Sequence, residues 1–334
     1  MSASFWEPRL RADTIVGMRD AGRPVRFGHC LVSLKSYIGD CVMALPLFEE
    51  IEQHFSEVTY LAGGALQQVI CQSKPDRRVI PANKTKHPLD VIKEAKWMRS
   101  QRFDATIIVN HSFRSALTTA LAGIPIRVGH ATELRSWALT HAIPYDQGEF
   151  ESQSSLDLIR ALGVSADGKV PTFSVTDHQR QRGAELVGNA MVGLQPGARF
   201  GAKQIPIPTC VELSKRLTAA GYKLCLLGGK DESQYAEPII EATNGDAVDL
   251  IGKTSISETL GVLANLNLMI GGDTGLMHMA AAVDCPSLTI FGPTPIEKWG
   301  HNYGKHVAIQ SPGDNMDNIR AEVILELALR QLSG

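Results

Sequence analysis

The sequence predicts an α/β protein of two domains, each with a parallel sheet that is covered by helices. Apolar strand-like runs alternate with amphipathic stretches along the chain, and this rhythm is typical of parallel sheets. The rhythm pauses once, at residues 163–181, where glycines and a proline occur with little periodicity. A length of 334 residues also favours two hydrophobic cores over one.

The first domain is predicted to span residues 1–172. It opens with an apolar run that ends before the sharp Gly39-Asp40 turn, and an amphipathic helical pattern follows that turn. The same two patterns then recur along this half of the chain. The predicted strands are 27–34, 58–61, 105–109 and 126–128, and the predicted helices are 41–54, 89–99 and 112–121.

The second domain, residues 190–316, follows a linker that we place at 173–189. Two open α/β domains of similar size leave a ligand cleft between them, beyond the carboxyl ends of the strands. Apolar runs again predict strands, and helical patterns lie between them. The predicted strands are 191–195, 223–227, 248–250, 268–270 and 287–291, and the predicted helices are 210–220, 232–242, 257–264, 276–283 and, at the end of the chain, 321–332.

Charge and cysteine content exclude several classes of protein. The formal net charge of -2 excludes a nucleic-acid binder that works by bulk charge, because such domains are strongly basic. The 6 cysteines form no CxxC pair and no zinc-like spacing with histidine, which favours reduced, buried thiols in a cytoplasmic protein. No apolar run approaches the ~20 residues of a membrane span, so any membrane contact is expected to be peripheral.

The strongest local motif is GGDTGLMH at residues 271–278, which follows an apolar strand and opens a helix. Glycines allow the backbone to approach a ligand closely, and the free amides of a helix N-terminus favour an anion. Thr274 adds a hydroxyl, and His278 lies one turn further on the same side, which suits a diphosphate. The alternative is a simple capped turn, with Asp273 or Thr274 as the N-cap and His278 in the core.

A second glycine-rich loop follows another predicted strand, at residues 194–203. Its two cations are Arg199 and Lys203, and Lys203 is the candidate for neutralising a phosphate. The alternative is a surface loop whose charges are solvated, and the spacing alone favours that alternative.

The turn between the first predicted strand and helix carries a carboxylate, Asp40. A carboxylate that points into the cleft can take a proton from an acceptor hydroxyl as a general base. The alternative is that Asp40 only caps the helix that begins at Cys41, and one residue can serve both purposes.

Arginines lie close together in the first domain, at Arg114, Arg127 and Arg135. A cationic patch formed by them would suit an acidic, phosphorylated glycolipid headgroup. The alternative is a solvated charged surface, which is the usual environment of arginine.

Taken in this order, the motifs resemble glycosyltransferase family nine, the ADP-heptose–lipopolysaccharide heptosyltransferases. The resemblance extends over most of the chain, from about residue 31 to residue 300. It rests on Gly39-Asp40 with ALPL at 44–47, QPGARFGAK at 195–203, GKTS at 252–255, GDTGLMHMAAA at 272–282 and FGPT at 291–294.

The resemblance implies a GT-B fold, in which two Rossmann-like domains face across a cleft and the final helix, 317–334, packs back on the first domain. It also implies metal-independent transfer with inversion at the anomeric carbon. No metal or other cofactor is expected, because no DxD pair follows a strand to hold a divalent ion on a diphosphate. The donor would be ADP-heptose and the acceptor an acidic lipopolysaccharide core.

Carried over residue by residue, the resemblance assigns the chemistry to two residues. Asp40 would be the base that activates the acceptor hydroxyl, and Lys203 would bind the donor diphosphate and stabilise the leaving group. The remaining candidates are Gly197, Arg199, Lys253, Asp273, Thr274, Gly275 and His278 for the donor, Asp231 or Glu232 for its ribose, and Lys35, Arg114, Arg127 and Arg135 for the acceptor.

Within the family, residues 112–116 and 122–125 are closest to the type that adds the second heptose, heptosyltransferase II. A cytoplasmic enzyme with peripheral contact at the inner membrane is the corresponding expectation. Alternatives within the GT-B class are another nucleotide-sugar donor, an epimerase, or a different glycan or protein as acceptor. A non-catalytic nucleotide-sugar-binding protein would not need Asp40. A nicotinamide dehydrogenase would need GxGxxG spacing, which residues 271–275 do not have.

Overall fold

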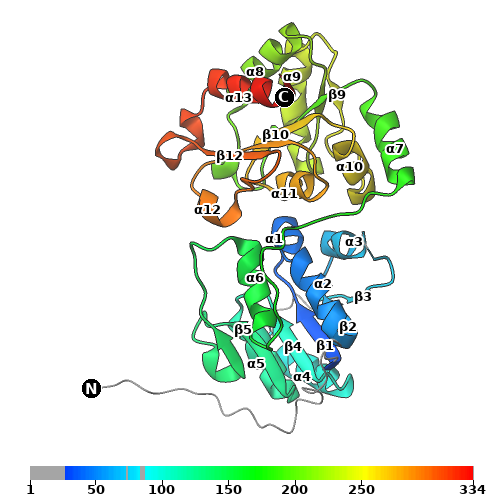
Figure 1. Ribbon diagram of the computed structural model, residues 1–334, viewed down its shortest axis with the longest axis vertical. Coiled ribbons are helices and arrows are strands. Elements are labelled where there is room, and N and C mark those ends of the chain that lie inside the picture. Colours follow the sequence, from blue (N-terminus) through cyan, green and yellow to red (C-terminus); the bar gives the residue numbers. More distant parts are fainter. Residues whose placement is uncertain (1–26, 73, 83–86, 334) are drawn as a thin grey trace.

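The computed structural model describes residues 27–72, 74–82 and 87–333, and contains two parallel sheets of six strands each (Figure 1). The strand orders are β3-β2-β1-β4-β5-β6 and β9-β8-β7-β10-β11-β12. When the strands of each domain are numbered along the chain, both sheets have the order 3-2-1-4-5-6. This is the strand order of a doubly wound Rossmann fold. The predicted pair of Rossmann-like domains is therefore confirmed. The first 26 residues of the predicted first domain lie outside the described residues.

The first domain places α2 and α6 together, and α4 and α5 together, against its sheet. Strand β4 is buried along its whole length, as expected of a central parallel strand. Its elements are β1 (Phe27–Ser33), α1 (Ile38–Met43), α2 (Leu45–His54), β2 (Phe55–Leu61), α3 (Ala65–Cys71), β3 (Arg78–Ile80), α4 (Pro88–Ser100), β4 (Ala105–Ile108), α5 (Phe113–Ala122), β5 (Ile126–His130), the 3-10 turn η2 (Ser136–Ala138), β6 (His141–Ile143) and α6 (Glu151–Arg160).

The second domain repeats this construction, and its central strands β10 and β11 are buried throughout. Its elements are α7 (Asp177–Val187), β7 (Val192–Leu194), η3 (Gly201–Lys203), α8 (Ile207–Ala219), β8 (Leu224–Leu226), η4 (Lys230–Tyr235), α9 (Ala236–Ala242), β9 (Val248–Asp249), α10 (Ile256–Leu263), β10 (Leu268–Gly272), α11 (Gly275–Ala282), β11 (Ser287–Phe291), α12 (Ile296–Trp299), β12 (His306–Gln310), η5 (Pro312–Asp314), η6 (Met316–Asn318) and α13 (Ala321–Ser333).

The predicted helix 41–54 is two helices, α1 and α2, which meet at Ala44. Pro46 lies in the first turn of α2, where its missing N–H is tolerated, whereas inside one continuous helix it would remove a hydrogen bond. The break leaves α1 as a short helix at the carboxyl end of β1. Its N-terminus carries Asp40 in the first turn.

The predicted linker is wrong in its position. Residues 173–189 include α7, which packs against α10 of the second domain and is anchored there by the Gln179 amide, 2.9 Å from the Ser257 hydroxyl. The connection between the domains is the segment 161–176 that precedes α7. A capping box at Thr176 starts the helix, which is why the irregular stretch ends there.

The final helix does not pack on the first domain as the resemblance implied. Helix α13 lies on α8 and on strands β10 and β11 of the second domain. Its buried positions Ala321, Ile324 and Ala328 recur at helical spacing and join the core of that domain. The apolar face of α13 therefore covers the sheet of the second domain.

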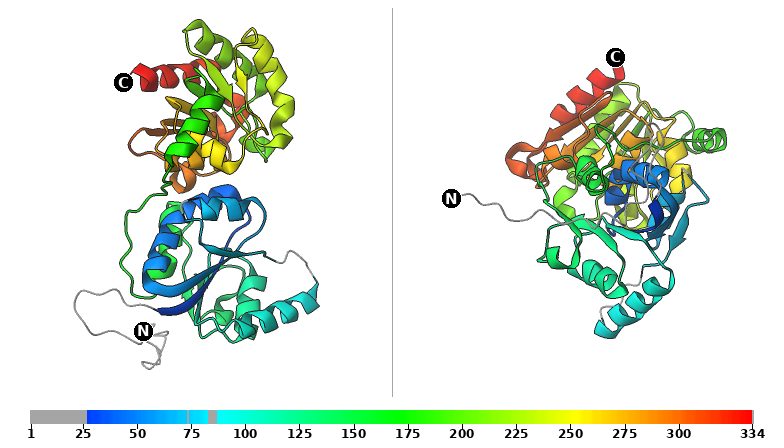
Figure 2. Two further views of the ribbon diagram at one scale, coloured as in Figure 1. Left: turned by 90° about the vertical axis from the view of Figure 1, so that its right-hand side faces the viewer. Right: turned by 60° about the horizontal axis from the view of Figure 1, so that its bottom comes forward.

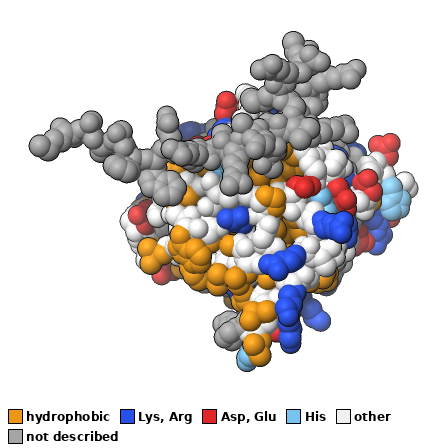
Figure 3. Space-filling model, turned by 90° about the horizontal axis from the view of Figure 1, so that it is seen from below, with side chains coloured by type: hydrophobic (Ala, Val, Ile, Leu, Met, Phe, Trp, Pro, Cys, Tyr) orange, Lys and Arg blue, Asp and Glu red, His pale blue; other side chains and the backbone are white. Residues whose placement is uncertain are grey.

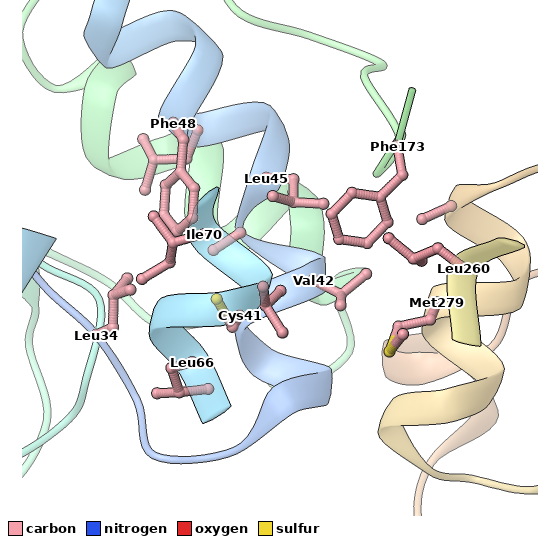
Figure 4. Packing of buried hydrophobic residues seen from close by; sticks show 14 of the residues in the cluster. Leu34, Cys41, Val42, Leu45, Phe48, Leu66, Ile70, Phe173, Leu260 and Met279 are labelled. Atoms are coloured by element: carbon pink, nitrogen blue, oxygen red, sulfur yellow. The ribbon is translucent and has the colours of Figure 1, made fainter. Parts of the chain in front are cut away.

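The two domains form separate lobes, one above the other (Figure 2). They touch where α1 meets α11 and where α3 meets α10. Phe173, in the connecting segment, lies between Val42 and Leu45 of the first domain and Leu260 and Met279 of the second (Figure 4). No helix within the described residues is both long and apolar enough to span a lipid bilayer.

Candidate active site

The candidate site lies where α1 of the first domain meets α11 of the second. Each helix follows the carboxyl end of a central strand, the position where open α/β sheets bind ligands. The contact depends on two glycines. A Cβ on Gly275 would lie 3.0 Å from the Gly39 nitrogen, and a Cβ on Gly39 would lie 2.8 Å from Cδ2 of His278. The GD and DTG motifs of the sequence are thus brought face to face.

Asp40 lies in the first turn of α1 and does not cap it. The N-cap is Tyr37, and no side-chain hydrogen bond caps this helix, so the simple capping interpretation is wrong. One carboxylate oxygen of Asp40 lies 3.4 Å from the Lys35 ammonium. The same ammonium also donates to Glu151, at the start of α6.

The two carboxylates of this cluster have pKa values shifted in opposite directions. Burial raises the pKa of Asp40, Glu151 raises it further, and Lys35 opposes both. Burial would also raise the pKa of Glu151, but two lysines and a hydrogen bond from Tyr145 hold that pKa below its ordinary value. Asp40 is therefore the carboxylate better suited to accept a proton.

On the other side of the contact, Asp273 is buried among three polar partners. Lys203 lies 2.6 Å from one of its oxygens, and the Thr294 hydroxyl donates to the same oxygen at 2.8 Å. Nε2 of His278 lies 3.5 Å from the other oxygen. Burial would raise the pKa of Asp273, but His278 and Lys203 hold it far below its ordinary value. Asp273 is thus a fixed negative charge.

Lys203 reaches Asp273 because the loop before it packs directly on strand β10. A Cβ on Gly272 would lie 2.1 Å from the carbonyl oxygen of Lys203, so only glycine allows this approach. The predicted loop of solvated charges is therefore wrong for Lys203, whose ammonium is ion-paired and half-buried. Arg199 in the same loop is exposed, as that prediction expects, and its guanidinium lies 5.0 Å from the centre of the Tyr37 ring of the first domain.

His278 is held by residues that sequence reasoning missed. Its Nδ1 lies 2.8 Å from Nε2 of His301, and Nδ1 of His301 lies 2.8 Å from the Tyr303 hydroxyl. Burial and the nearby histidines lower the pKa of His301 to about 2, so its ring is neutral. His301 thus links His278 to the Tyr303 hydroxyl, and Nε2 of His278 faces Asp273.

Thr274 is the N-cap residue of α11, but its side chain makes no capping hydrogen bond. Its hydroxyl donates to Oε1 of Gln195 at 2.5 Å, and the Gln195 amide lies 3.2 Å from Glu232. Burial raises the pKa of Glu232. Of the two ribose candidates, Glu232 is joined to the site by these contacts, whereas Asp231 is exposed.

The remaining donor candidates lie on the same side. Gly197 borders Glu232, because a Cβ there would lie 2.6 Å from its Cγ. Lys253 is exposed and pairs with Asp249 at 2.5 Å. The structure thus joins Gly197 and Glu232, and leaves Lys253 at the surface.

The three arginines of the predicted acceptor patch all contact other groups of the first domain. Arg135 is fully buried and donates to the carbonyl oxygens of His130 and Asn110 at 2.8 and 2.6 Å. Arg127 donates to two backbone carbonyls, and Arg114 pairs with Glu94 at 3.3 Å. The guanidinium groups of Arg127 and Arg135 hold backbone segments together, because a planar group with five donors satisfies several carbonyls at once. Of the acceptor candidates, Lys35 alone lies beside Asp40.

Neither metal-binding nor disulfide chemistry is visible in the described part of the chain. Within it, no group of three or more His, Cys, Asp and Glu side chains is placed to hold a metal ion. The 6 cysteines are all free, and burial raises the pKa of the thiols at Cys41, Cys210, Cys225 and Cys285 to about 12. They therefore serve as packing groups.

Known proteins are similar to this chain in sequence and in fold. The sequence profile of glycosyltransferase family 9 (heptosyltransferase) matches residues 91–326. Lipopolysaccharide heptosyltransferase 2 of Escherichia coli is 27% identical over 294 residues, which cover 79% of this chain and 82% of that protein.

Solved structures agree on the architecture. The ADP-heptose heptosyltransferase II of E. coli has a TM-score of 0.78 at 23% identity, with 91% of this chain and 98% of that chain covered. An E. coli heptosyltransferase solved with ADP-2-deoxy-2-fluoro heptose has a TM-score of 0.69 at 20% identity, with 90% and 99% covered. Two parallel six-stranded sheets that meet at the carboxyl ends of their central strands match this GT-B architecture. The chain therefore belongs to glycosyltransferase family 9, the heptosyltransferase family, and is a glycosyltransferase with a GT-B fold.

Proposed function

We propose that this enzyme transfers heptose from ADP-heptose to the inner core of a lipopolysaccharide acceptor, with inversion at the anomeric carbon and without a metal. The observation that carries the proposal is the meeting of α1 and α11. A half-buried carboxylate with a raised pKa lies on one side, and a lysine and a helix N-terminus without a side-chain cap lie on the other. Family membership and the names of the relatives support the donor and the acceptor.

The donor is proposed to bind on the second domain, with its diphosphate at the N-terminus of α11. Free amides and the helix dipole favour an anion there, and Lys203 supplies a full charge. Glu232 is proposed to accept hydrogen bonds from the ribose hydroxyls. Asp273 and His278 would then contact the heptose and the phosphates.

In the proposed reaction Asp40 removes the proton from an acceptor hydroxyl, and the oxygen attacks the anomeric carbon. The bond from that carbon to the diphosphate breaks on the opposite face, and ADP leaves with the bonding electron pair. Lys203 and the α11 amides stabilise the charge that develops on the leaving diphosphate. Inversion requires base and leaving group on opposite faces, and one group from each domain meets this requirement.

Calorimetric titration with nucleotide sugars tests the donor. We expect ADP-heptose to bind more tightly than UDP-, GDP- and ADP-glucose, and to be transferred to a heptose-deficient core acceptor. Tighter binding of a UDP- or GDP-sugar would show that this sugar, and not ADP-heptose, is the donor. Binding of ADP-heptose without transfer to any glycan or protein acceptor would favour a non-catalytic role.

The same transfer assay, run with EDTA, tests metal independence. We expect an unchanged rate, because the proposed site neutralises the diphosphate with Lys203 and backbone amides rather than with a cation. Loss of activity that magnesium or manganese restores would contradict this mechanism.

We also propose peripheral membrane contact through α4. Leu89 and Ile92 are 55% and 48% exposed, and at helical spacing they share a face with Lys93 and Lys96. Apolar side chains beside lysines suit an anionic membrane surface. The view from below, the end where α4 lies in Figure 1, shows hydrophobic side chains beside Lys and Arg (Figure 3).

Co-sedimentation with vesicles checks this contact. The protein should bind vesicles that contain anionic lipid and not purely zwitterionic ones, and I92E with K93E should reduce binding at least about fivefold. The control is V323E, which changes a 40% exposed position on α13. Equal binding of the α4 variant and the wild type would remove α4 from the proposal.

A further inference from the structure

A second group of buried charges joins the domains beside Asp40. Lys298, in the short helix α12 of the second domain, is only 5% exposed. Its ammonium lies 3.3 Å from Oε2 of Glu151 and donates to the backbone oxygens of Asp146 and Glu149 at 3.1 and 3.3 Å. It also lies 4.3 Å from the centre of the Tyr145 ring. Each of these partners belongs to the first domain.

Glu151 links this lysine to the base. One of its oxygens accepts from Lys35, and the other faces Lys298 and accepts from the Tyr145 hydroxyl at 3.0 Å. Lys35 lies closer to Glu151 than to Asp40, from which it is 3.4 Å away. Lys35 therefore interacts with both Asp40 and Glu151, and Glu151 also interacts with Lys298 of the second domain.

We propose that Glu151 and Lys298 are positioning residues for the base Asp40, and that Lys298 completes the cluster only when the two domains are in contact. The inference rests on the proposed function of Asp40. Glu151 draws Lys35 away from a full ion pair with Asp40. Lys298 supplies a second cation to Glu151 and thereby limits how strongly Glu151 holds Lys35.

The arrangement resolves a conflict at a carboxylate base. An aspartate that is fully paired with a lysine is ionised but accepts a proton poorly, whereas a buried aspartate without a cation is not ionised. A shared lysine gives an intermediate state. Because one of the cations comes from the second domain, the base reaches this state when that domain closes on the first.

Within the described residues, the charged groups that act on Asp40 come from both domains. Lys35 and Glu151 lie on its own domain, and His278 faces it from α11. Tyr145 donates to Glu151 and also interacts electrostatically with Asp40, whereas Lys298 acts through Glu151. Removing the negative charge of Glu151 should lower the pKa of Asp40, whereas removing the positive charge of Lys298 should raise it.

The test measures the apparent pKa of the acid limb of kcat/KM for transfer in Glu151→Gln and Lys298→Met. We expect a downward move of at least about 0.5 pH unit in the first and an upward move of similar size in the second. In the double variant most of the Lys298→Met effect should disappear, because Lys298 acts through Glu151. A role in folding alone does not produce opposite shifts.

A second readout does not depend on turnover. Carboxyl-¹³C-labelled aspartate, with the Asp40 resonance assigned by its loss in Asp40→Asn, should titrate with the same two opposite shifts. If the wild type transfers no sugar, the proposed function fails while this titration still decides the network. If Glu151→Gln does not fold, as judged by thermal melting, the upward shift in Lys298→Met decides it alone.

The matched control is Glu50→Gln. Glu50 is 3% exposed, as is Glu151, and it pairs with Lys169 of the connecting segment. Glu50→Gln should leave the apparent pKa of the acid limb at its wild-type value. An acid limb and an Asp40 titration that do not move in either test variant, or that move in the same direction in both, would overturn the proposal.

Discussion

Asp40→Asn is expected to lower kcat for heptose transfer by about 10²- to 10⁴-fold, the range that general bases contribute. The substitution keeps the shape of the side chain and removes its ability to take a proton. Donor affinity should change little, because the donor is proposed to bind the second domain. Calorimetry with ADP-heptose and a transfer assay on the same preparation measure the two effects separately.

The pH dependence of the wild type follows from the same group. Because the pKa of Asp40 is raised, transfer should be lost as the pH falls through a value above that of an ordinary aspartate. The control is Asp177→Asn, which also removes a carboxylate from the first turn of a helix but lies on α7. A variant Asp40→Asn with near-wild-type kcat would mean that another group takes the proton.

Lys203→Met is expected to reduce kcat/KM by about 10²- to 10³-fold, the size of effect seen when a group that stabilises developing charge is removed. Two causes act together. The leaving diphosphate loses its cation, and Asp273, which Lys203 neutralises at 2.6 Å, becomes a negative charge that repels the donor. The effect should therefore fall on donor affinity as well as on kcat.

Lys305→Met is a suitable comparison. Lys305 pairs with Asp284 at 2.7 Å in the second domain, as Lys203 pairs with Asp273. It lies directly before β12, at the amino end of that strand, whereas the candidate site lies at the carboxyl ends of the strands. Steady-state kinetics with varied donor measure both variants. Equal kinetics for the two would show that Lys203 serves only the ion pair with Asp273.

Fold class and site motifs were predictable because they are local. Alternation of apolar runs with helical patterns predicts a parallel sheet, and a glycine-rich turn indicates a strand that leads into a helix. Gly39-Asp40 and residues 271–278 were recognised in this way, and the structure brings them together. Helices α3, α6, α7 and α12 and strands β3, β6 and β12 were not predicted.

The partners of the site residues were not predictable, because no local pattern marks them. Glu151 is a glutamate at the start of an amphipathic helix, a position where glutamates are usually exposed. His301 and Lys298 lie close to the FGPT motif in sequence, but only the packing of α12 against the first domain gives Lys298 its role. The arginines show the reverse case. Their spacing indicated a patch, and burial turned Arg135 into a structural residue.

What the sequence determined by itself is the repeated α/β pattern, the family, and the positions of Asp40, Lys203 and the turn at 271–278. These depend on periodicity and on turn geometry within a few residues. Only the tertiary structure decided that α13 stays on the second domain, that α7 belongs to it, and that Lys298 reaches Glu151. The physical reason is that burial and ion pairing depend on which distant segments meet, and that information is spread over the whole chain.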